Sequence, residues 1–309
     1  MELEPFHDGE VRAQELAGEE RLAERNSAAI QSRILRGAFP FIRQQPMAIL
    51  ATLDSLGKPW CSIVFGKPGF MQPSEDARRL TMSVQECERS DFDPLWSNVF
   101  GEPLVGALLI DLASRRRLKI NGHCTLTSDE MTIDVSESFP LCPKYIQSRS
   151  LRLDDMVNSS GDSSLRGMVL GQLQLDTVHR SDTFFVASTH DTRGPDASHR
   201  GGMPGFVKTM NDVTLKIPDY PGNSMFNTFG NLLLNPKAGL VFLDFHRRRL
   251  LQLTGKAEIL WNQPGTESET GGSRRFWYFH CEQWIECAMP QAVSSELLDF
   301  SPFNPPLAD

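Results

Sequence analysis

Polar residues gather on two short segments in the second half of the chain, and their types are those that bind anions. The first segment is Ser198-His199-Arg200-Gly201-Gly202. An arginine presents a planar fork of donors that suits a phosphate, and adjacent glycines let the backbone come close to a ligand. The alternative interpretation is structural: a strand that bends at two glycines and carries a surface arginine would have the same sequence. On this segment alone the two interpretations have equal weight.

The second segment places polar side chains just after a glycine. It carries Gly222-Asn223-Ser224, then Asn227-Thr228, then Gly230-Asn231-Leu232. We expect a short helix over 224–234, and the free N–H groups at a helix N-terminus favour phosphate. For Ser224 alone, a plain helix cap is the better interpretation. Together, the two segments predict a phosphate-bearing ligand that the second half of the chain binds.

An internal repeat shows which elements position these residues. Residues 51–70 align with 187–206 at an offset of 136, and residues 103–122 align with 236–255 at an offset of 133. The identical pairs include Pro59/Pro195, Ser62/Ser198, Gly106/Gly239, Asp111/Asp244 and Arg115/Arg248. Two collinear blocks in the same order indicate two copies of one structural unit. His199 and Arg200 stand where the first copy has Ile63 and Val64, so the copies differ at the proposed ligand site.

Each copy has the pattern of a small β domain. Short β-rich runs separated by turn residues predict strands at 47–53, 60–65, 104–111 and 118–126, and again at 183–189, 238–244 and 250–260. We expect helices at 9–35 after an Asp8 cap, at 224–234 and at 275–287. The predicted organisation is an N-terminal helix with the first unit over 1–150, a linker over 151–166, and a second unit with a C-terminal helix and tail over 167–309.

Composition limits the classes of function. The chain has 309 residues and a net charge of −8, with 40% hydrophobic and 23% charged residues, which is typical of globular proteins. An acidic total argues against non-specific nucleic-acid binding. No run approaches the roughly 18 apolar residues of a membrane helix. The six cysteines are scattered without metal-site spacing, so we expect reduced thiols, no metal and a cytoplasmic protein.

Several blocks of the chain resemble the pyridoxamine 5′-phosphate oxidase-related, FMN-binding split-barrel family. In the second half these are Thr183-Phe-Phe-Val-Ala-Ser, Ser198-His-Arg-Gly-Gly, Pro204-Gly-Phe-Val, Gly222-Asn, Gly230-Asn-Leu and Leu251-Gln-Leu-Thr-Gly. In the first half they are Phe6-His-Asp-Gly-Glu, Gly57-Lys-Pro-Trp, Pro68-Gly-Phe, Arg115-Arg-Arg-Leu-Lys-Ile-Asn-Gly and Cys142-Pro-Lys-Tyr-Ile-Gln. The resemblance implies a mainly β fold of two tandem six-stranded split barrels with peripheral helices. Flavin would lie between the barrels, in a pseudo-dimer within one chain, and a homodimer of such pairs stays open.

The resemblance also implies a set of cofactor-binding residues. They are Ser198, His199, Arg200, Gly201, Gly202, Asn223, Thr228, Asn231 and Gln252 from the second unit, and Lys144, Tyr145, Gln147 and Arg149 from the first. Tyr145 has a ring that stacks, and Lys144 or Arg149 would neutralise a phosphate. An ordered connector between the units is the alternative interpretation of 142–149. We interpret the arginine runs 115–117 and 247–249 as solvated hairpin corners.

The predicted function is an FMN-dependent oxidoreductase that acts on a small organic substrate. Electrons would come from NAD(P)H or a separate reductase, since no reductase module accompanies the barrels. The flavin carries such chemistry, so no catalytic side chain is assigned; His199 is the single candidate for proton transfer. The alternative is a non-catalytic flavin- or haem-binding protein. A duplicated barrel with a degenerate pocket is a third interpretation, and the retained polar segments argue against it.

Overall fold

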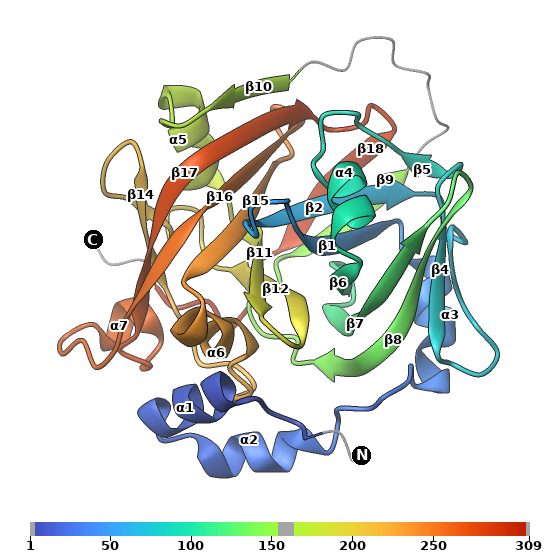
Figure 1. The fold of residues 1–309 in the computed structure, drawn as a ribbon. Helices are drawn as coiled ribbons and strands as arrows, with labels where there is room; N and C mark the ends of the chain where they lie inside the picture. The colour runs from blue at the N-terminus through green and yellow to red at the C-terminus, as the bar shows by residue number, and fades with distance from the viewer. Residues whose placement is uncertain (1–3, 154–163, 307–309) are drawn as a thin grey trace.

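Two barrel-like antiparallel sheets, one from each half of the chain, form the frame of the molecule (Figure 1). This computed structural model describes residues 4–153 and 164–306. The first sheet contains β1 (Met47–Leu53), β2 (Pro59–Gly66), β3 (Met71–Pro73), β4 (Arg79–Ser83), β5 (Cys87–Glu88), β6 (Leu104–Asp111), β7 (Arg116–Leu126) and β8 (Glu130–Leu141). The second contains β11 (Thr183–His190), β12 (Gly194–Gly201), β13 (Lys208–Thr209), β14 (Thr214–Pro218), β15 (Lys237–Asp244), β16 (Arg249–Leu260) and β17 (Phe276–Ala288).

The remaining strands join the ends of the two units. β10 (Ser164–Gly167) pairs with β17, and β9 (Ser148–Leu153) pairs with β18 (Val293–Asp299) in a separate two-stranded ribbon. The predicted linker therefore contains the end of β9 and most of β10, and its residues 154–163 lie outside the described part of the chain.

The two sheets share one topology. Without the short strands β3, β5 and β13, the strand orders are β4-β8-β7-β6-β1-β2 and β14-β17-β16-β15-β11-β12. Position by position, these six-stranded paths match the two sequence copies, since β1 and β11 start 136 residues apart and β6 and β15 start 133 apart. The predicted fold class, two tandem six-stranded split barrels in a mainly β chain, is confirmed.

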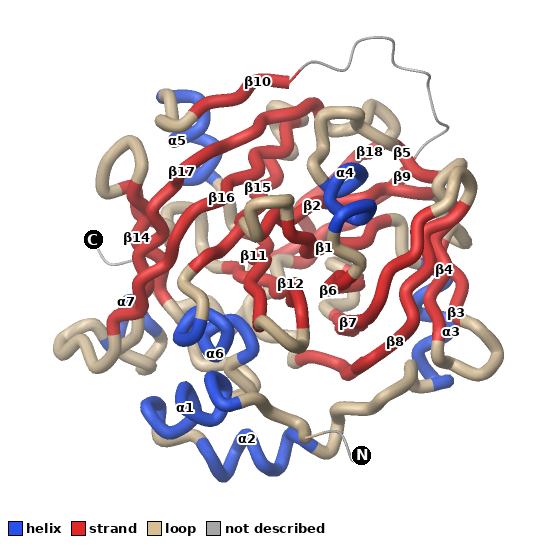
Figure 2. The backbone as a smooth tube through the Cα atoms, in the orientation of Figure 1, coloured by secondary structure: helices blue, strands red, loops and turns tan. Residues whose placement is uncertain are grey.

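Helices lie at the periphery of the sheets (Figure 2). They are α1 (Asp8–Ala17), α2 (Glu20–Ser27), α3 (Phe39–Gln44), α4 (Leu95–Gly101), α5 (Gln172–Arg180), α6 (Asn227–Leu234) and α7 (Glu267–Thr270), with a 3-10 turn at Arg36–Ala38. The expected helix at 9–35 is wrong in extent, because Gly18 adopts φ 66° and ends α1. Its N-cap is His7 rather than Asp8. α6 starts at Asn227, since Ser224 and Phe226 adopt left-handed φ angles of 63° and 59°.

The expected helix at 275–287 is a strand. β17 pairs with β16 along its whole length, from Leu260↔Phe276 to Arg249↔Ala288. Most of its side chains are buried, so its letters show no clear alternation between apolar and polar residues. A helix signal drawn from such a run carries little information, because buried strands and buried helices look alike in a single sequence.

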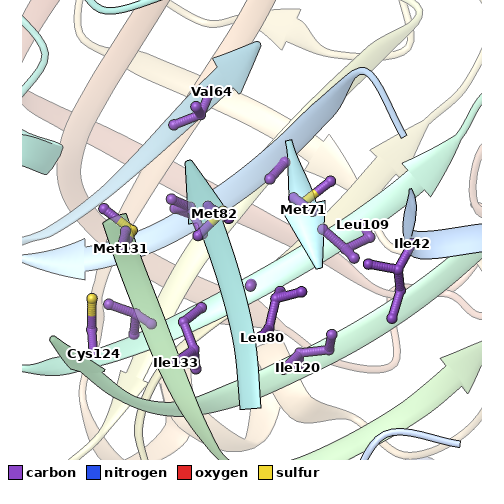
Figure 3. Packing of buried hydrophobic residues seen from close by; sticks show 14 of the residues in the cluster. Ile42, Val64, Met71, Leu80, Met82, Leu109, Ile120, Cys124, Met131 and Ile133 are labelled. Carbon is purple, nitrogen blue, oxygen red and sulfur yellow. The ribbon is translucent and has the colours of Figure 1, made fainter. Parts of the chain in front are cut away.

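The three largest apolar cores explain why the central strands are buried on both faces. One fills the first barrel, where Leu80, Met82, Ile120 and Ile133 meet (Figure 3). A second fills the second barrel around Trp277. The third lies between the units and takes alternate residues of the central strands: Met47, Ile49 and Ala51 from β1, with Phe185 and Ala187 from β11.

Two glycines bring the units into close contact at equivalent points. A Cβ atom on Gly106 would lie 2.5 Å from the Pro195 carbonyl oxygen, and one on Gly239 would lie 2.5 Å from the Pro59 carbonyl oxygen. The contacts correspond under the repeat, since each joins β6 or β15 of one unit to the first residues of β12 or β2 of the other. The interface therefore has an approximate twofold symmetry, and both copies need glycine there for the backbones to meet.

The repeated aspartates stabilise equivalent hairpin turns. Asp111 accepts hydrogen bonds from the Ala113 N–H at 3.0 Å and the Ser114 hydroxyl at 2.5 Å, and Asp244 accepts from the Arg247 N–H at 2.8 Å. This confirms the predicted hairpins between β6 and β7 and between β15 and β16.

Candidate functional site

A cavity between the two units has four cationic side chains in its lining. It comprises about 850 Å³ of open space, its mouth included. The first unit contributes Arg117 from β7 and the segment 141–145; the second contributes 198–201 from β12, the loop 218–226, the start of α6, and Arg275. We call it the cationic cavity. Both units are needed to build it.

The charge of this cavity suits an anion. Its lining includes Arg117, Lys144, Arg200 and Arg275 against a single carboxylate, Asp219. Arg275 is already neutralised, because its Nε lies 2.9 Å from Asp219 and its Nη1 lies 3.0 Å from Glu19. Arg200 is 3.8 Å from the other oxygen of Asp219. Its buried Nε has no hydrogen-bond acceptor among the described residues. An excess of positive charge is therefore left for a ligand.

His199 is held in one tautomer by its neighbour. Arg117 Nη1 lies 3.2 Å from His199 Nδ1, and a guanidinium only donates, so Nδ1 must accept. The proton of the neutral ring is then on Nε2, which is buried without a partner in the described structure. Burial lowers the pKa of His199 well below 6.5, and the charges of Arg117 and Arg200 lower it further. His199 thus presents a neutral N–H donor.

Arg117 itself is fixed by the first unit. Its guanidinium donates to the Cys142 carbonyl from both Nε, at 3.0 Å, and Nη2. Burial lowers the pKa of Arg117, and the nearby charge of Arg200 also lowers it. The interpretation of 115–117 as a solvated corner is wrong for Arg117, because strand β7 already begins at Arg116 and turns the next side chain toward the other unit.

Lys119 lies two residues further along β7 and is fully buried. Its Nζ is 2.5 Å from Asp196, 3.3 Å from the Ser198 hydroxyl and 3.4 Å from the Asn227 amide oxygen. The Lys119–Asp196 pair therefore joins the first unit to β12 and to the start of α6. Asn121, the next residue on this face, also donates to Asp196 at 3.2 Å.

The N-terminal helices contact the start of α6 and the loop that borders the cavity, and α1 lies beside α6 in Figure 1. Asn227 Nδ2 donates to Glu10 at 2.5 Å, the Ser224 hydroxyl donates to Glu19 at 2.6 Å, and Asn26 Nδ2 donates to the Asn223 carbonyl at 2.7 Å. Although α1 precedes the first barrel in the chain, it packs on the second.

Burial changes the pKa of Glu10, the carboxyl group that accepts the hydrogen bond from Asn227. Glu10 is 4% exposed, and desolvation raises its pKa to about 7. Its Oε2 accepts from the His7 backbone N–H at 3.0 Å, which completes a capping box. Burial lowers the pKa of His7 to about 4, with the neighbouring His190 lowering it too. His7 Nε2 is 2.9 Å from Asn231 Oδ1.

Eight of the predicted site residues line the cationic cavity. They are Ser198, His199, Arg200, Gly201, Asn223, Thr228, Lys144 and Tyr145. Tyr145 closes one side: its hydroxyl donates to the Pro221 carbonyl at 2.9 Å, and its ring centroid is 5.0 Å from that of Tyr220. Burial raises the pKa of Tyr145 to about 12, so it stays protonated.

Five predicted residues lie outside this cavity and have other contacts. Gln147 accepts from the Ser301 N–H at 2.8 Å, Arg149 pairs with Asp182, and Gly202 packs against Phe206. Asn231 donates to the Ser188 hydroxyl at 3.0 Å. This contact repeats the one between Asn98 and Thr52 in the first unit, which indicates a structural role. Gln252 crosses the interface and donates to two residues of the first unit, the Cys61 carbonyl and the Ser62 hydroxyl, both at 3.0 Å.

The lining and neighbouring residues that the predicted site set lacks come from β7 of the first unit, and from the loop after β14, the start of α6 and the residue before β17 in the second unit. They are Arg117, Lys119, Asp219, Tyr220, Asn227 and Arg275. One signal was available: Arg117, Lys119 and Asn121 alternate along a strand, so they share one face. Their counterparts in the second copy are Leu250, Gln252 and Thr254, which carry no charge. This face of the strand therefore differs between the two copies.

Comparison with known proteins finds a family similar to the second unit. A family model described as pyridoxamine 5′-phosphate oxidase matches residues 172–285, which contain β12, the 218–226 loop and α6. This segment, which is less than half of the chain, is similar to that family. The resemblance seen in the sequence is confirmed over these residues. No curated protein matches the chain.

Several solved structures are similar to parts of the chain. HupZ of Group A Streptococcus has 18% identity and a TM-score of 0.31, covering 37% of this chain and 90% of its own. A putative pyridoxamine 5′-phosphate oxidase from Lactobacillus delbrueckii has 14% identity and a TM-score of 0.32, covering 39% and 97%. An FAD-binding protein from Mesorhizobium loti has 13% identity and a TM-score of 0.29, covering 41% and 98%.

Within residues 4–153 and 164–306, no helix is long and apolar enough to span a bilayer. No three His, Cys, Asp or Glu side chains within these ranges lie close enough together to hold a metal ion.

Proposed function

We propose that this chain binds FMN in the cationic cavity and acts as an FMN-dependent oxidoreductase on a small organic molecule. The observation that carries the proposal is the pair of buried donors, His199 Nε2–H and Arg200 Nε–H, which have no partner among the described residues. An unpaired buried donor costs about 1–3 kcal/mol, which a ligand acceptor would recover. The family match over 172–285 supports a flavin as that ligand.

The phosphate end of FMN fits the cationic part of this cavity. Arg200 and Lys144 carry charge that the described protein groups leave largely uncompensated, and Arg117 adds a third positive charge beside His199. A phosphate with about two negative charges would bind there by charge-assisted hydrogen bonds. Tyr145 and Tyr220 provide aromatic surface next to this cluster.

Bound FMN would supply hydride and single-electron transfer, and the protein would bind and orient it. His199 does not move a proton in this proposal, because its pKa lies far below neutrality and its ring is already neutral. It donates a hydrogen bond from Nε2 instead. NAD(P)H or a separate reductase would be the electron donor. The substrate is a small organic molecule that enters from the open mouth of the cavity.

The haem-binding alternative is less consistent with this geometry. A histidine that ligates iron offers a lone pair, whereas the contact with Arg117 puts the proton of His199 on Nε2 and leaves Nδ1 occupied. A non-catalytic flavin binder differs from an enzyme only in turnover. Anaerobic addition of NAD(P)H separates the two: flavin that bleaches and recovers in air supports the enzyme, and flavin that stays oxidised supports the binder.

The binding proposal is tested by titrating FMN fluorescence with the full chain. We expect Arg200→Ala to weaken FMN binding at least tenfold, because it removes a charged hydrogen bond worth about 1.5–3 kcal/mol. Val64→Ala is the matched control, since Val64 occupies the equivalent position in the first unit. Equal affinity of the Arg200→Ala variant and the unmodified protein, or no binding of FMN by either, would refute the proposal.

A further inference from the structure

The interface holds a second pocket at the position related to the cationic cavity by the repeat. It comprises about 820 Å³ with its mouth, against about 850 Å³ for the cationic cavity. Its lining includes Ile63 and Val64 from β2, Leu250 from β16 and the end of β17. We call it the first-unit pocket. The approximate twofold symmetry has preserved its position and size.

Its chemistry differs from that of the cationic cavity at each equivalent position. His199 and Arg200 correspond to Ile63 and Val64 at the offset of 136, and Arg117 corresponds to Leu250 at the offset of 133. The strand registers agree, because Ile63 pairs with Ile49 as His199 pairs with Phe185. These substitutions remove the donors that would bind a phosphate and leave an apolar wall.

Negative charge replaces positive charge at the rim. The charged residues of the lining are Glu88, Asp93 and Arg89, so two carboxylates face one guanidinium. Arg89 lies over the Trp96 ring at 4.7 Å and 3.9 Å from Asp91, so part of its charge is neutralised outside the pocket. Asp93 accepts from the Ser62 hydroxyl at 2.6 Å and the Leu95 N–H at 2.9 Å.

Glu88 is the group available to a ligand. Its Oε1 is buried and accepts no hydrogen bond from any described residue. Burial raises the pKa of Glu88, so its charged form lacks compensation from the protein. An ammonium group would provide it, and the apolar wall and the Trp96 ring would pack against the body of the same molecule.

We propose that the first-unit pocket is a second binding site, which takes an apolar amine rather than a phosphate ester. The two pockets of the duplicated barrel then have opposite charge preferences. The proposal stands on the first-unit pocket alone and does not depend on which ligand occupies the cationic cavity.

A pair of probes that differ only in charge tests this site in the full chain. 2-Phenylethylamine and phenylacetate carry the same ring with an ammonium or a carboxylate. By calorimetry at pH 8, where the Glu88 carboxylate is expected to be ionised, we expect saturable binding of one amine per chain, at least tenfold tighter than phenylacetate. Glu88→Gln should reduce this preference at least fivefold while keeping the size of the side chain. Equal affinity for the two probes, tighter binding of the carboxylate, or no saturable binding overturns the proposal.

Two controls assign the binding to the right pocket. Arg200→Ala alters the cationic cavity and should leave amine affinity unchanged. Saturating FMN should also leave it unchanged, whereas competition between FMN and the amine would place the amine in the cationic cavity and refute the assignment. A circular dichroism spectrum of Glu88→Gln that matches the unmodified protein ensures that a lost preference reflects the charge and not the fold.

Discussion

Replacing Glu10 with glutamine should change how the stability of this protein depends on pH. Glu10 has a pKa of about 7 in the folded chain against 4.5 as its ordinary value. A raised folded pKa means that the folded state binds the proton more tightly than the unfolded state. The stabilisation that Glu10 gives when protonated is therefore complete below pH 4.5 and is lost as pH rises to about 7.

The size of this loss follows from the shift. Each pKa unit corresponds to about 1.4 kcal/mol, so the shift of Glu10 amounts to about 3 kcal/mol. His7 acts in the opposite sense: its pKa is lowered to about 4, so its contribution increases between pH 4 and 6.5. In the unmodified protein the two effects largely cancel over that range. Glu10→Gln removes one of them.

The assay is the thermal midpoint of both proteins from pH 5 to pH 8. At about 2 cal/mol/K of unfolding entropy per residue, 3 kcal/mol corresponds to about 5 °C for a chain of this length. As pH rises across this range, we expect the thermal midpoint of Glu10→Gln to increase by about 5 °C relative to that of the unmodified protein. Glu15→Gln is the control, because Glu15 is half exposed and pairs with Arg12 on the same helix. Curves for Glu10→Gln and the unmodified protein that stay parallel within 1 °C would refute the reasoning.

Three further predictions concern the site and the interface. Between pH 5.5 and 7.5, the pH dependence of FMN affinity should be the same in His199→Asn as in the unmodified protein, because burial keeps His199 neutral and the FMN phosphate itself titrates at about pH 6; an inflection that disappears in His199→Asn would contradict this. Gly239→Ala should destabilise the chain by about 1–3 kcal/mol through its clash with the Pro59 carbonyl, whereas Gly37→Ala, which has open space, should not; equal denaturation midpoints would disprove the close contact. Lys119→Met should cost about 3–5 kcal/mol because it leaves Asp196 buried without its cation, and adding Asp196→Asn should recover part of the loss; no recovery in urea denaturation would argue against the pair.

The strands that carry the repeat could be predicted because both copies have the same local signals, whereas the buried run of β17 could not. Turn residues bracket each predicted run, and β1 and β11 lie where the letters placed them. The helices were less predictable, since their limits depend on single backbone angles. Gly18 ends α1, and Phe226 delays the start of α6, through left-handed conformations that no periodic pattern reveals.

The second-unit part of the cavity could be predicted from Ser198-His199-Arg200, because these residues are consecutive and differ from the first copy. The first-unit part could not. Arg117 reads as one of three adjacent arginines, and only the fold shows that it alone reaches His199 across the interface. Arg275 lies in a run without alternation, and its partners Glu19 and Asp219 are distant in the sequence.

The covalent joining of the two barrels changes what a point mutation can do. In an assembly of two identical chains, any codon change alters both symmetric sites at once, so neither can lose its original ligand while the other keeps it. In this chain, Arg117 and Leu250 are encoded separately, as are Arg200 and Val64. A substitution, natural or engineered, can therefore change the ligand preference of one half of the interface and leave the other half unchanged.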